Sequence, residues 1–182
     1  MSRSLDTIHI AGAGVGGLAA AVALQRRGLP VVVHERAAEL VPVGAGLSLW
    51  PNAVMALRSI GVDVGGQRGA GGLYRWDGRP LAVGDGEAIE TRYGAPLVLL
   101  HRADLQQALL DSLAPGTTRL GETVDTFLQE DHRVVVRLTD GRSHSGALLI
   151  GADGLRSAVR ERLLGPESLR DSGLVAHRAV VA

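Results

Sequence analysis

The sequence contains no cysteine and no lysine, and it has only one Phe, two Trp and two Tyr among its 182 residues. Without cysteine, a disulfide framework, thiolate catalysis and dithiol redox chemistry are excluded. Without lysine, Schiff-base catalysis and the phosphate-binding lysine of a P-loop are excluded as well. No apolar run approaches about 18 residues, and the N-terminal stretch MSRSLDTIHIAG lacks the apolar core of a signal peptide. We therefore expect a soluble, cytoplasmic protein with no membrane segment.

An excess of one charge is also lacking, because 19 arginines balance 19 acidic residues. No global field attracts a polyanion, so we predict no nucleic-acid partner. The six histidines show no H-x-E or H-x-x-E-H pattern, and we assign no metal site. The nucleophile elbow G-x-S-x-G does not occur, which argues against acyl transfer.

Strand and helix signals alternate along the chain, which is typical of an α/β fold. Residues 7–11 and 30–35 are predicted strands on either side of a predicted helix at 15–27, which together make a βαβ unit. Further predicted elements are helices at 51–60, 102–113 and 155–164, and strands at 124–129, 133–138 and 143–150.

Two stretches between these elements are rich in glycine. The stretch VGAG, with Gly44 and Gly46, is predicted to be a loop before the helix at 51–60. Residues 65–97 shift in composition towards Gly, Asp and aromatic residues, and LYRWDGRPLAV has the Asp-Gly dipeptide of a hairpin turn. We predict an inserted antiparallel piece there.

The clearest motif is IAGAGVGG, in which Gly12, Gly14 and Gly17 have G-x-G-x-x-G spacing after a strand and at the start of a helix. In this geometry the glycines allow a tight turn, close approach to a pyrophosphate and close packing of helix on strand. The helix N-terminus then stabilises the phosphate charge. Glu35 ends the next strand, where a carboxylate accepts hydrogen bonds from ribose hydroxyls and repels a 2′-phosphate. The motif predicts a dinucleotide site.

The fingerprint alone leaves the dinucleotide open, because NAD and the ADP half of FAD present the same groups to it. Two further motifs, the Gly44–Gly46 loop followed by Pro-Asn-Ala and the segment HRADLQQALLDSL, do not belong to a minimal NAD domain. HRADLQQALLDSL places Arg102, which can pair with phosphate, at a helix start. IGADGLRSAVR, residues 150–160, follows a strand and precedes a helix. An ordinary turn is the alternative for this last motif, since Asp-Gly is a common turn dipeptide.

Together, in this order and spacing, these motifs resemble the FAD-dependent aromatic hydroxylases, the class A flavoprotein monooxygenases of the para-hydroxybenzoate hydroxylase type. The resemblance covers nearly the whole chain. It implies a Rossmann-like FAD-binding domain with three layers around a parallel central sheet, and the beginning of a split β-sheet substrate domain. On this basis residues 1–182 form an incomplete FAD-binding domain, with residues 65–97 and 170–182 as parts of the substrate domain.

The resemblance also implies a set of cofactor-binding residues. They are Gly12, Gly14, Gly17, Glu35, Arg36, Gly46, Arg102, Val124, Asp153 and Arg160. The three fingerprint glycines are expected at the FAD pyrophosphate, Glu35 at the adenosine ribose and Arg36 near the adenine half. Arg102 is expected at the phosphates or the ribityl chain.

The remaining members of this set are spread over three segments. The backbone at Val124 is expected to meet the adenine, and Gly46 lies in a loop near the flavin. Asp153 and Arg160 are expected beside the pyrophosphate, where Asp153 holds its turn and Arg160 offers a planar cation.

The implied chemistry belongs mainly to the cofactor. In the resembled family NADH or NADPH reduces FAD, which then reacts with O₂ and transfers one oxygen atom to a small aromatic or polyketide-like molecule. Protein groups position the reactants and exclude water. No side-chain nucleophile is required, so the catalytic residues are left unassigned.

The chain departs from the family pattern at its end. The family continues with more of the substrate domain and a G-D-A-x-H motif, whereas this sequence ends with SGLVAHRAVVA, which resembles the strand entering that domain. We expect a truncated product or one part of a split enzyme, joined by a complementing C-terminal chain or self-associating through an open sheet edge. Two alternatives are an NAD(P)-dependent oxidoreductase domain and a non-catalytic remnant that serves as an interaction module.

Overall fold

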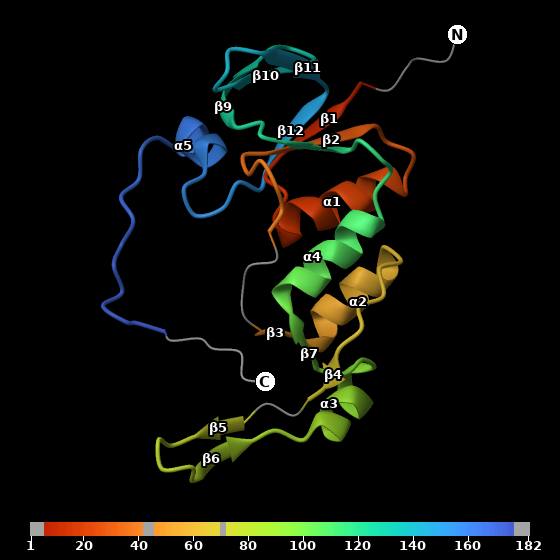
Figure 1. The fold of residues 1–182 in the computed structure, drawn as a ribbon, viewed down its shortest axis with the longest axis vertical. Coiled ribbons are helices and arrows are strands. Elements are labelled where there is room, and N and C mark those ends of the chain that lie inside the picture. The colour runs from red at the N-terminus through yellow and green to blue at the C-terminus, as the bar shows by residue number, and fades with distance from the viewer. Residues whose placement is uncertain (1–5, 42–45, 70–71, 177–182) are drawn as a thin grey trace. The chain divides into compact units, whose positions relative to one another are not determined.

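The computed structural model describes residues 6–41, 46–69 and 72–176 (Figure 1). The chain divides into two units, with boundaries after Val41 and before Leu109. Among the described residues, the first unit contains those up to Val41 and those from Leu109 onward, and the second unit contains those between them.

The first unit is built on a four-stranded parallel sheet in the order β12-β1-β2-β8. Its strands are β1 (Ile8–Ala11), β2 (Val31–Glu35), β8 (Thr118–Leu120) and β12 (Leu148–Gly151). Helix α1 (Val15–Gln25) connects β1 to β2 and packs on both of them. The runs IHIA and VVVHE carry apolar residues on both faces because the sheet is covered on both sides.

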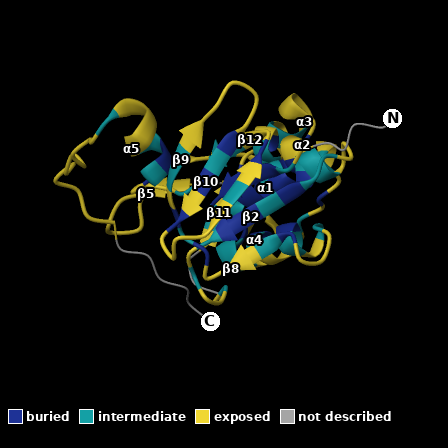
Figure 2. Cartoon of the chain, turned by 90° about the horizontal axis from the view of Figure 1, so that it is seen from above, coloured by how far each residue is buried: buried dark blue, intermediate teal, exposed yellow. Residues whose placement is uncertain are grey.

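A three-stranded antiparallel sheet covers the face opposite α1 (Figure 1). It consists of β9 (Val124–Gln129), β10 (Val134–Leu138) and β11 (Ser143–Gly146), and helix α5 (Ala158–Leu164) packs beside β9. Between the two sheets, Ala11 of β1 joins Val124, Val136 and Val159 in one buried cluster. Figure 2 shows β2 largely buried and α5 largely exposed. This three-layer arrangement around a parallel sheet confirms the predicted Rossmann-like α/β class.

The second unit carries two small antiparallel sheets, one with the order β3-β7-β4 and one formed by the hairpin β5-β6. Its strands are β3 (Gly46–Leu49), β4 (Gln67–Arg68), β5 (Gly72–Tyr74), β6 (Pro80–Val83) and β7 (Val98–His101). Its helices are α2 (Pro51–Ser59), α3 (Gly86–Tyr93) and the start of α4 (Arg102–Asp111). As predicted, Pro51 occupies the first turn of α2, where its missing N–H costs no hydrogen bond.

The single strand predicted over residues 143–150 is wrong, because the chain changes sheets within it. β11 pairs with β10, whereas β12 pairs with β1. The change occurs at Ala147, whose N–H donates to the Thr7 carbonyl at 2.9 Å. At Gly146 an added Cβ would overlap the Thr7 carbonyl oxygen and lie 2.5 Å from the His9 ring. The backbone therefore passes so close to the start of β1 that only glycine fits.

Two predictions for the second unit also need correction. Gly46 lies in strand β3 rather than in a loop, while Gly44 lies outside the described residues. The predicted hairpin around Asp77 is confirmed, but the predicted antiparallel piece at residues 65–97 also contains a helix, α3, at residues 86–93. The helix forms because the Asp85 carboxylate accepts hydrogen bonds from two backbone N–H groups of its first turn.

The substrate-domain assignment of residues 65–97 and 170–182 stays a prediction. Residues 170–176 form no helix or strand, and residues 177–182 lie outside the part of the chain that the structure describes.

Replacing Gly146 by alanine is expected to lower the free energy of unfolding by about 2 kcal/mol, because the added methyl group meets fixed backbone at Thr7. Gly65→Ala is the control. A Cβ there has no neighbour within 4 Å, and the free energy of unfolding should stay the same or rise by up to about 1 kcal/mol. Urea denaturation followed by circular dichroism measures both. Equal stability of Gly146→Ala and wild type would contradict the close approach.

Candidate functional site

Three loops meet at the carboxyl end of the parallel sheet. Because β12, β1 and β2 are neighbours and parallel, the loops that follow them emerge at the same edge. The Gly12 N–H donates to the His34 carbonyl at 2.7 Å, and the Ala152 N–H donates to the Ala11 carbonyl at 2.8 Å. The fold therefore brings together the G-x-G-x-x-G turn, the end of β2 with Glu35 and the Asp-Gly motif at Asp153.

The three fingerprint glycines have different reasons to be glycine. Gly12 has a φ of 102°, and a Cβ there would lie 2.5 Å from the Ala152 carbonyl oxygen. A Cβ on Gly17 would overlap the Gly12 carbonyl oxygen. Gly14 has a φ of −69°, which any residue adopts, and nothing lies within 4 Å of its Cβ position. Folding therefore requires Gly12 and Gly17, whereas the open space at Gly14 fits a ligand that approaches the backbone.

Glu35 is held beside this turn by two hydrogen bonds. Its carboxylate accepts from the Ala13 N–H at 2.7 Å and from the Ala37 N–H at 2.9 Å. A carboxylate has about four lone-pair positions, so two of them remain for hydroxyl donors of a ligand. Arg36 follows directly and is exposed.

The Asp153 motif borders a cavity of about 490 Å³, lined by Gly16, Ser157, Arg160 and the loop after β12. The Asp153 carboxylate accepts from the Ser157 hydroxyl at 2.5 Å and from the Val159 N–H at 3.2 Å, which fixes the start of α5. The Arg160 guanidinium donates to the Leu155 carbonyl at 2.6 Å. Both side chains therefore hold this turn, and their contact with a pyrophosphate stays a prediction.

The other predicted residues lie in different parts of the chain. Val124 begins β9, and its side chain is buried in the core. Gly46 begins β3 and Arg102 begins α4, both in the second unit. Their places at the adenine, the flavin and the phosphates stay predictions.

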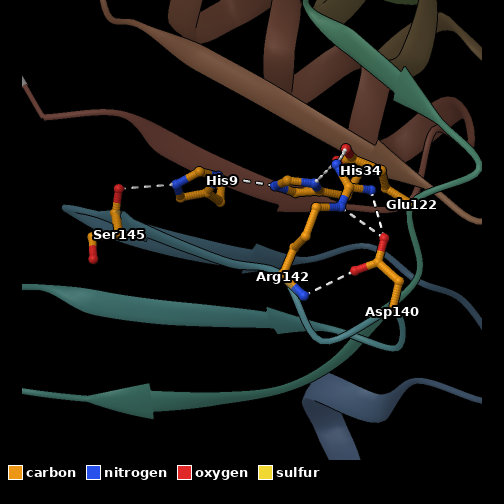
Figure 3. A network of polar contacts seen from close by, with 6 residues as sticks. All are labelled: His9, His34, Glu122, Asp140, Arg142 and Ser145. Carbon is orange, nitrogen blue, oxygen red and sulfur yellow. Dashed lines mark hydrogen bonds and ion pairs between the residues drawn. The ribbon is translucent and has the colours of Figure 1, made fainter.

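None of the sequence motifs predicts a buried polar network around His34 (Figure 3). His9 Nδ1 lies 2.9 Å from His34 Nε2, and His34 Nδ1 lies 2.7 Å from a Glu122 carboxylate oxygen. Arg142 donates to the other Glu122 oxygen at 2.7 Å and also binds Asp140. The only signal in the sequence is the single histidine within each of the apolar runs IHIA and VVVHE.

The His144 ring completes this cluster, with its centroid 6.0 Å from that of His9 and 5.4 Å from that of His34. Within the described ranges, no group of three or more His, Asp or Glu side chains is arranged to hold a metal ion. The network is therefore a set of hydrogen bonds between two sheets.

Burial sets the protonation of the network. Loss of water around the imidazoles lowers the pKa of His34 and the pKa of His9 below their ordinary value of 6.5, although the Glu122 and Ser145 hydrogen bonds oppose this. Electrostatic interactions with His144 and Arg119 lower the pKa of His34 further. Burial alone would raise the pKa of Glu122, but the hydrogen bonds from His34 and Arg142 keep the pKa below its ordinary value.

Comparison with known proteins identifies the family. Residues 5–175 match the family described as FAD binding domain. The chain is 41% identical over 179 residues to aurachin C monooxygenase/isomerase of Stigmatella aurantiaca, covering 96% of this chain and 47% of that protein. It is 37% identical over 188 residues to 3-hydroxybenzoate 6-hydroxylase of Polaromonas naphthalenivorans (strain CJ2), covering 96% of this chain and 46% of that protein.

A solved structure agrees with this comparison. Klebsiella pneumoniae HpxO complexed with FAD and uric acid superposes with a TM-score of 0.73 at 31% identity, covering 88% of this chain and 42% of that chain. The chain therefore belongs to the FAD-binding domain family, and the resemblance to FAD-dependent aromatic hydroxylases is confirmed. It spans about half the length of the curated relatives it matches. Among the described residues, no helix is both long and apolar enough to span a bilayer.

The buried histidines predict a pH dependence of stability. As the pH falls through 6.5, the unfolded chain binds protons that the folded chain, with its lower pKa values at His9 and His34, does not. The free energy of unfolding should then fall by up to about 1.4 kcal/mol per pH unit for each such proton. The contribution of Glu122 is complete above pH 4.5 and is lost only below it, so it does not disturb the interval from about pH 5.5 to 7.5.

Urea denaturation at several pH values across this interval measures how steeply the free energy of unfolding changes with pH. His34→Gln should reduce this dependence, whereas His132→Gln, at an exposed position outside the network, is the matched control. If His34→Gln has the same pH dependence of stability as wild type, the lowered pKa of His34 is not its cause.

Proposed function

We propose that this chain is the FAD-binding part of an NAD(P)H-dependent flavin monooxygenase that hydroxylates a small aromatic or polyketide-like molecule. The observation that supports it most directly is the open space at Gly14, which no contact within the described protein explains. The adjacent Glu35 carboxylate and the N-terminus of α1 suit a ribose and a pyrophosphate. The residues present therefore fit FAD.

Within this proposal each residue has a defined part. Gly12 and Gly17 shape the turn, and the N–H groups at the start of α1 bind the pyrophosphate. Glu35 accepts hydrogen bonds from the adenosine ribose, with Arg36 close to the adenine half. Asp153 and Arg160 hold the second wall of the phosphate site.

Three further residues complete the binding set in this proposal. The backbone at Val124 meets the adenine, Arg102 pairs with the phosphates or the ribityl chain, and Gly46 lies near the flavin.

FAD supplies the redox and oxygen-transfer chemistry when bound, with NADH or NADPH as reductant. Relatives named for 3-hydroxybenzoate and 6-hydroxynicotinate support a small aromatic substrate. A cytoplasmic location fits the proposal because the nicotinamide reductant is available there.

Neither alternative accounts for the observations as well. An NAD(P)-dependent domain would use the same fingerprint, but the family match and the relatives favour FAD. A non-catalytic remnant would not need a carboxylate held at the glycine turn by the Ala13 N–H, as that of Glu35 is.

We also infer a partner at the open edge of β12, supplied by a complementing C-terminal chain or by a second copy. β12 is the outer strand of the parallel sheet, and within the described residues only β1 pairs with it. Beside it lies a cavity of about 320 Å³ with Phe127, Leu149 and Leu163 among its lining residues. An edge strand with apolar surface is a template for pairing.

Gly14→Val should weaken FAD binding at least about tenfold, because the side chain occupies the space proposed for the pyrophosphate. Its free energy of unfolding should stay within about 1 kcal/mol of wild type, since Gly14 is an N-cap with ordinary backbone angles. Titration of the 182-residue chain with FAD, followed by flavin fluorescence, measures the affinity. A chain that ignores FAD but binds NADH would refute the proposal, as would tight FAD binding by Gly14→Val.

Pairing through β12 is testable by sedimentation. If a second copy occupies the edge, the mass of the wild-type chain should rise with concentration. Leu148→Arg should then remain monomeric, because Leu148 is 49% exposed on this strand and a charge there opposes pairing. A wild-type chain that stays monomeric at every concentration would exclude a second copy at this edge.

A further inference from the structure

Glu122 is bonded to two consecutive residues at the end of β2. Its backbone N–H donates to the Glu35 carbonyl at 2.9 Å, and its carboxylate accepts from His34 Nδ1 at 2.7 Å. The His34 carbonyl is in turn held by the Gly12 N–H at 2.7 Å. The backbone on both sides of the peptide bond between His34 and Glu35 is therefore fixed, and with it the direction in which the Glu35 side chain leaves the strand.

Glu122 itself has no freedom to turn. It is 8% exposed, and its second carboxylate oxygen accepts from Arg142 at 2.7 Å. Arg142 is also paired with Asp140, in the turn between β10 and β11. Figure 3 shows these side chains converging on Glu122 from β2 and from this turn. Charge-assisted hydrogen bonds of this length are the strong ones in proteins.

The Glu122 carboxylate fixes the tautomer of His34. An ionised carboxylate can only accept hydrogen bonds, and its other oxygen already accepts from Arg142. His34 Nδ1, at 2.7 Å, therefore carries a hydrogen and donates it to Glu122.

We propose that Glu122, held by His34 and Arg142, is a positioning residue for Glu35 and thereby strengthens binding of the adenosine end of FAD. This inference rests on the proposed function, because it assigns Glu35 to the adenosine ribose. Glu122 touches no ligand in this proposal. It acts by holding the Glu35 backbone so that the carboxylate is already directed at the Gly12 turn when the ribose arrives.

A double-mutant cycle tests this coupling, with FAD affinity of the 182-residue chain as the readout. In the presence of Glu35, the substitution Glu122→Gln should weaken FAD binding about fivefold, because an amide cannot accept from both His34 and Arg142. In a Glu35→Ala background the same substitution should change the affinity less than about twofold. A merely structural role would weaken binding equally in both backgrounds.

Val136→Ala is the matched control. Val136 is 0% exposed in the same core, so its truncation loosens the packing between the sheets without touching the hydrogen bonds to Glu35. Its FAD affinity should equal that of wild type. If Glu122→Gln does not fold, Arg142→Met, at a half-exposed position, removes one of the same bonds and replaces it in the cycle.

The outcomes separate the two proposals. Three results would overturn the positioning role even if the wild-type chain binds FAD. Glu122→Gln could lower FAD affinity equally with and without Glu35, or it could leave the affinity unchanged with Glu35 present. Val136→Ala could also lower FAD affinity as much as Glu122→Gln does. Failure of the wild-type chain to bind FAD would refute the proposed function itself, and the positioning role with it.

Discussion

The parallel pairing of β1 with β2 on one side and β12 on the other is the constraint on which the rest of the first unit depends. Its register sets Ala11 opposite both His34 and Gly151. The loops that follow these three strands are far apart in the sequence, and they therefore lie together at one edge of the sheet. The glycine turn, the Glu35 carboxylate and the Asp153 turn lie together because these three strands end at the same level.

The sequence predicted the parts of this arrangement that depend on local pattern. The β1-α1-β2 unit follows from an apolar run, the glycine spacing and a second apolar run, all within a short segment. The break between β11 and β12 could not be predicted, because the requirement for Gly146 arises from contact with Thr7 near the other end of the chain. Strands β3 and β7 escaped prediction for a similar reason, since four-residue strands are defined mainly by their partner.

The residues of the candidate site also fall into those that local sequence pattern predicts and those that depend on contacts between distant segments. Spacing alone selected the three glycines and Glu35, but it could not show that Gly12 and Gly17 serve the packing while Gly14 faces open space. The histidine network has no spacing rule at all. His9, His34 and Glu122 are distant in sequence, and the pairing of β2 with β1 on one side and with β8 on the other brings them together.

A buried ionic network adds little net stability, since desolvation of the charges offsets much of their attraction. Its value here lies in the register of β2. A shift by one residue would turn His34 towards α1 and place the Glu35 carboxylate between the sheets, away from the Ala13 N–H. Glu122 would then be a buried carboxylate without His34, which is strongly unfavourable. The network and the glycine turn therefore select the same register, which is the register that directs Glu35 towards the site.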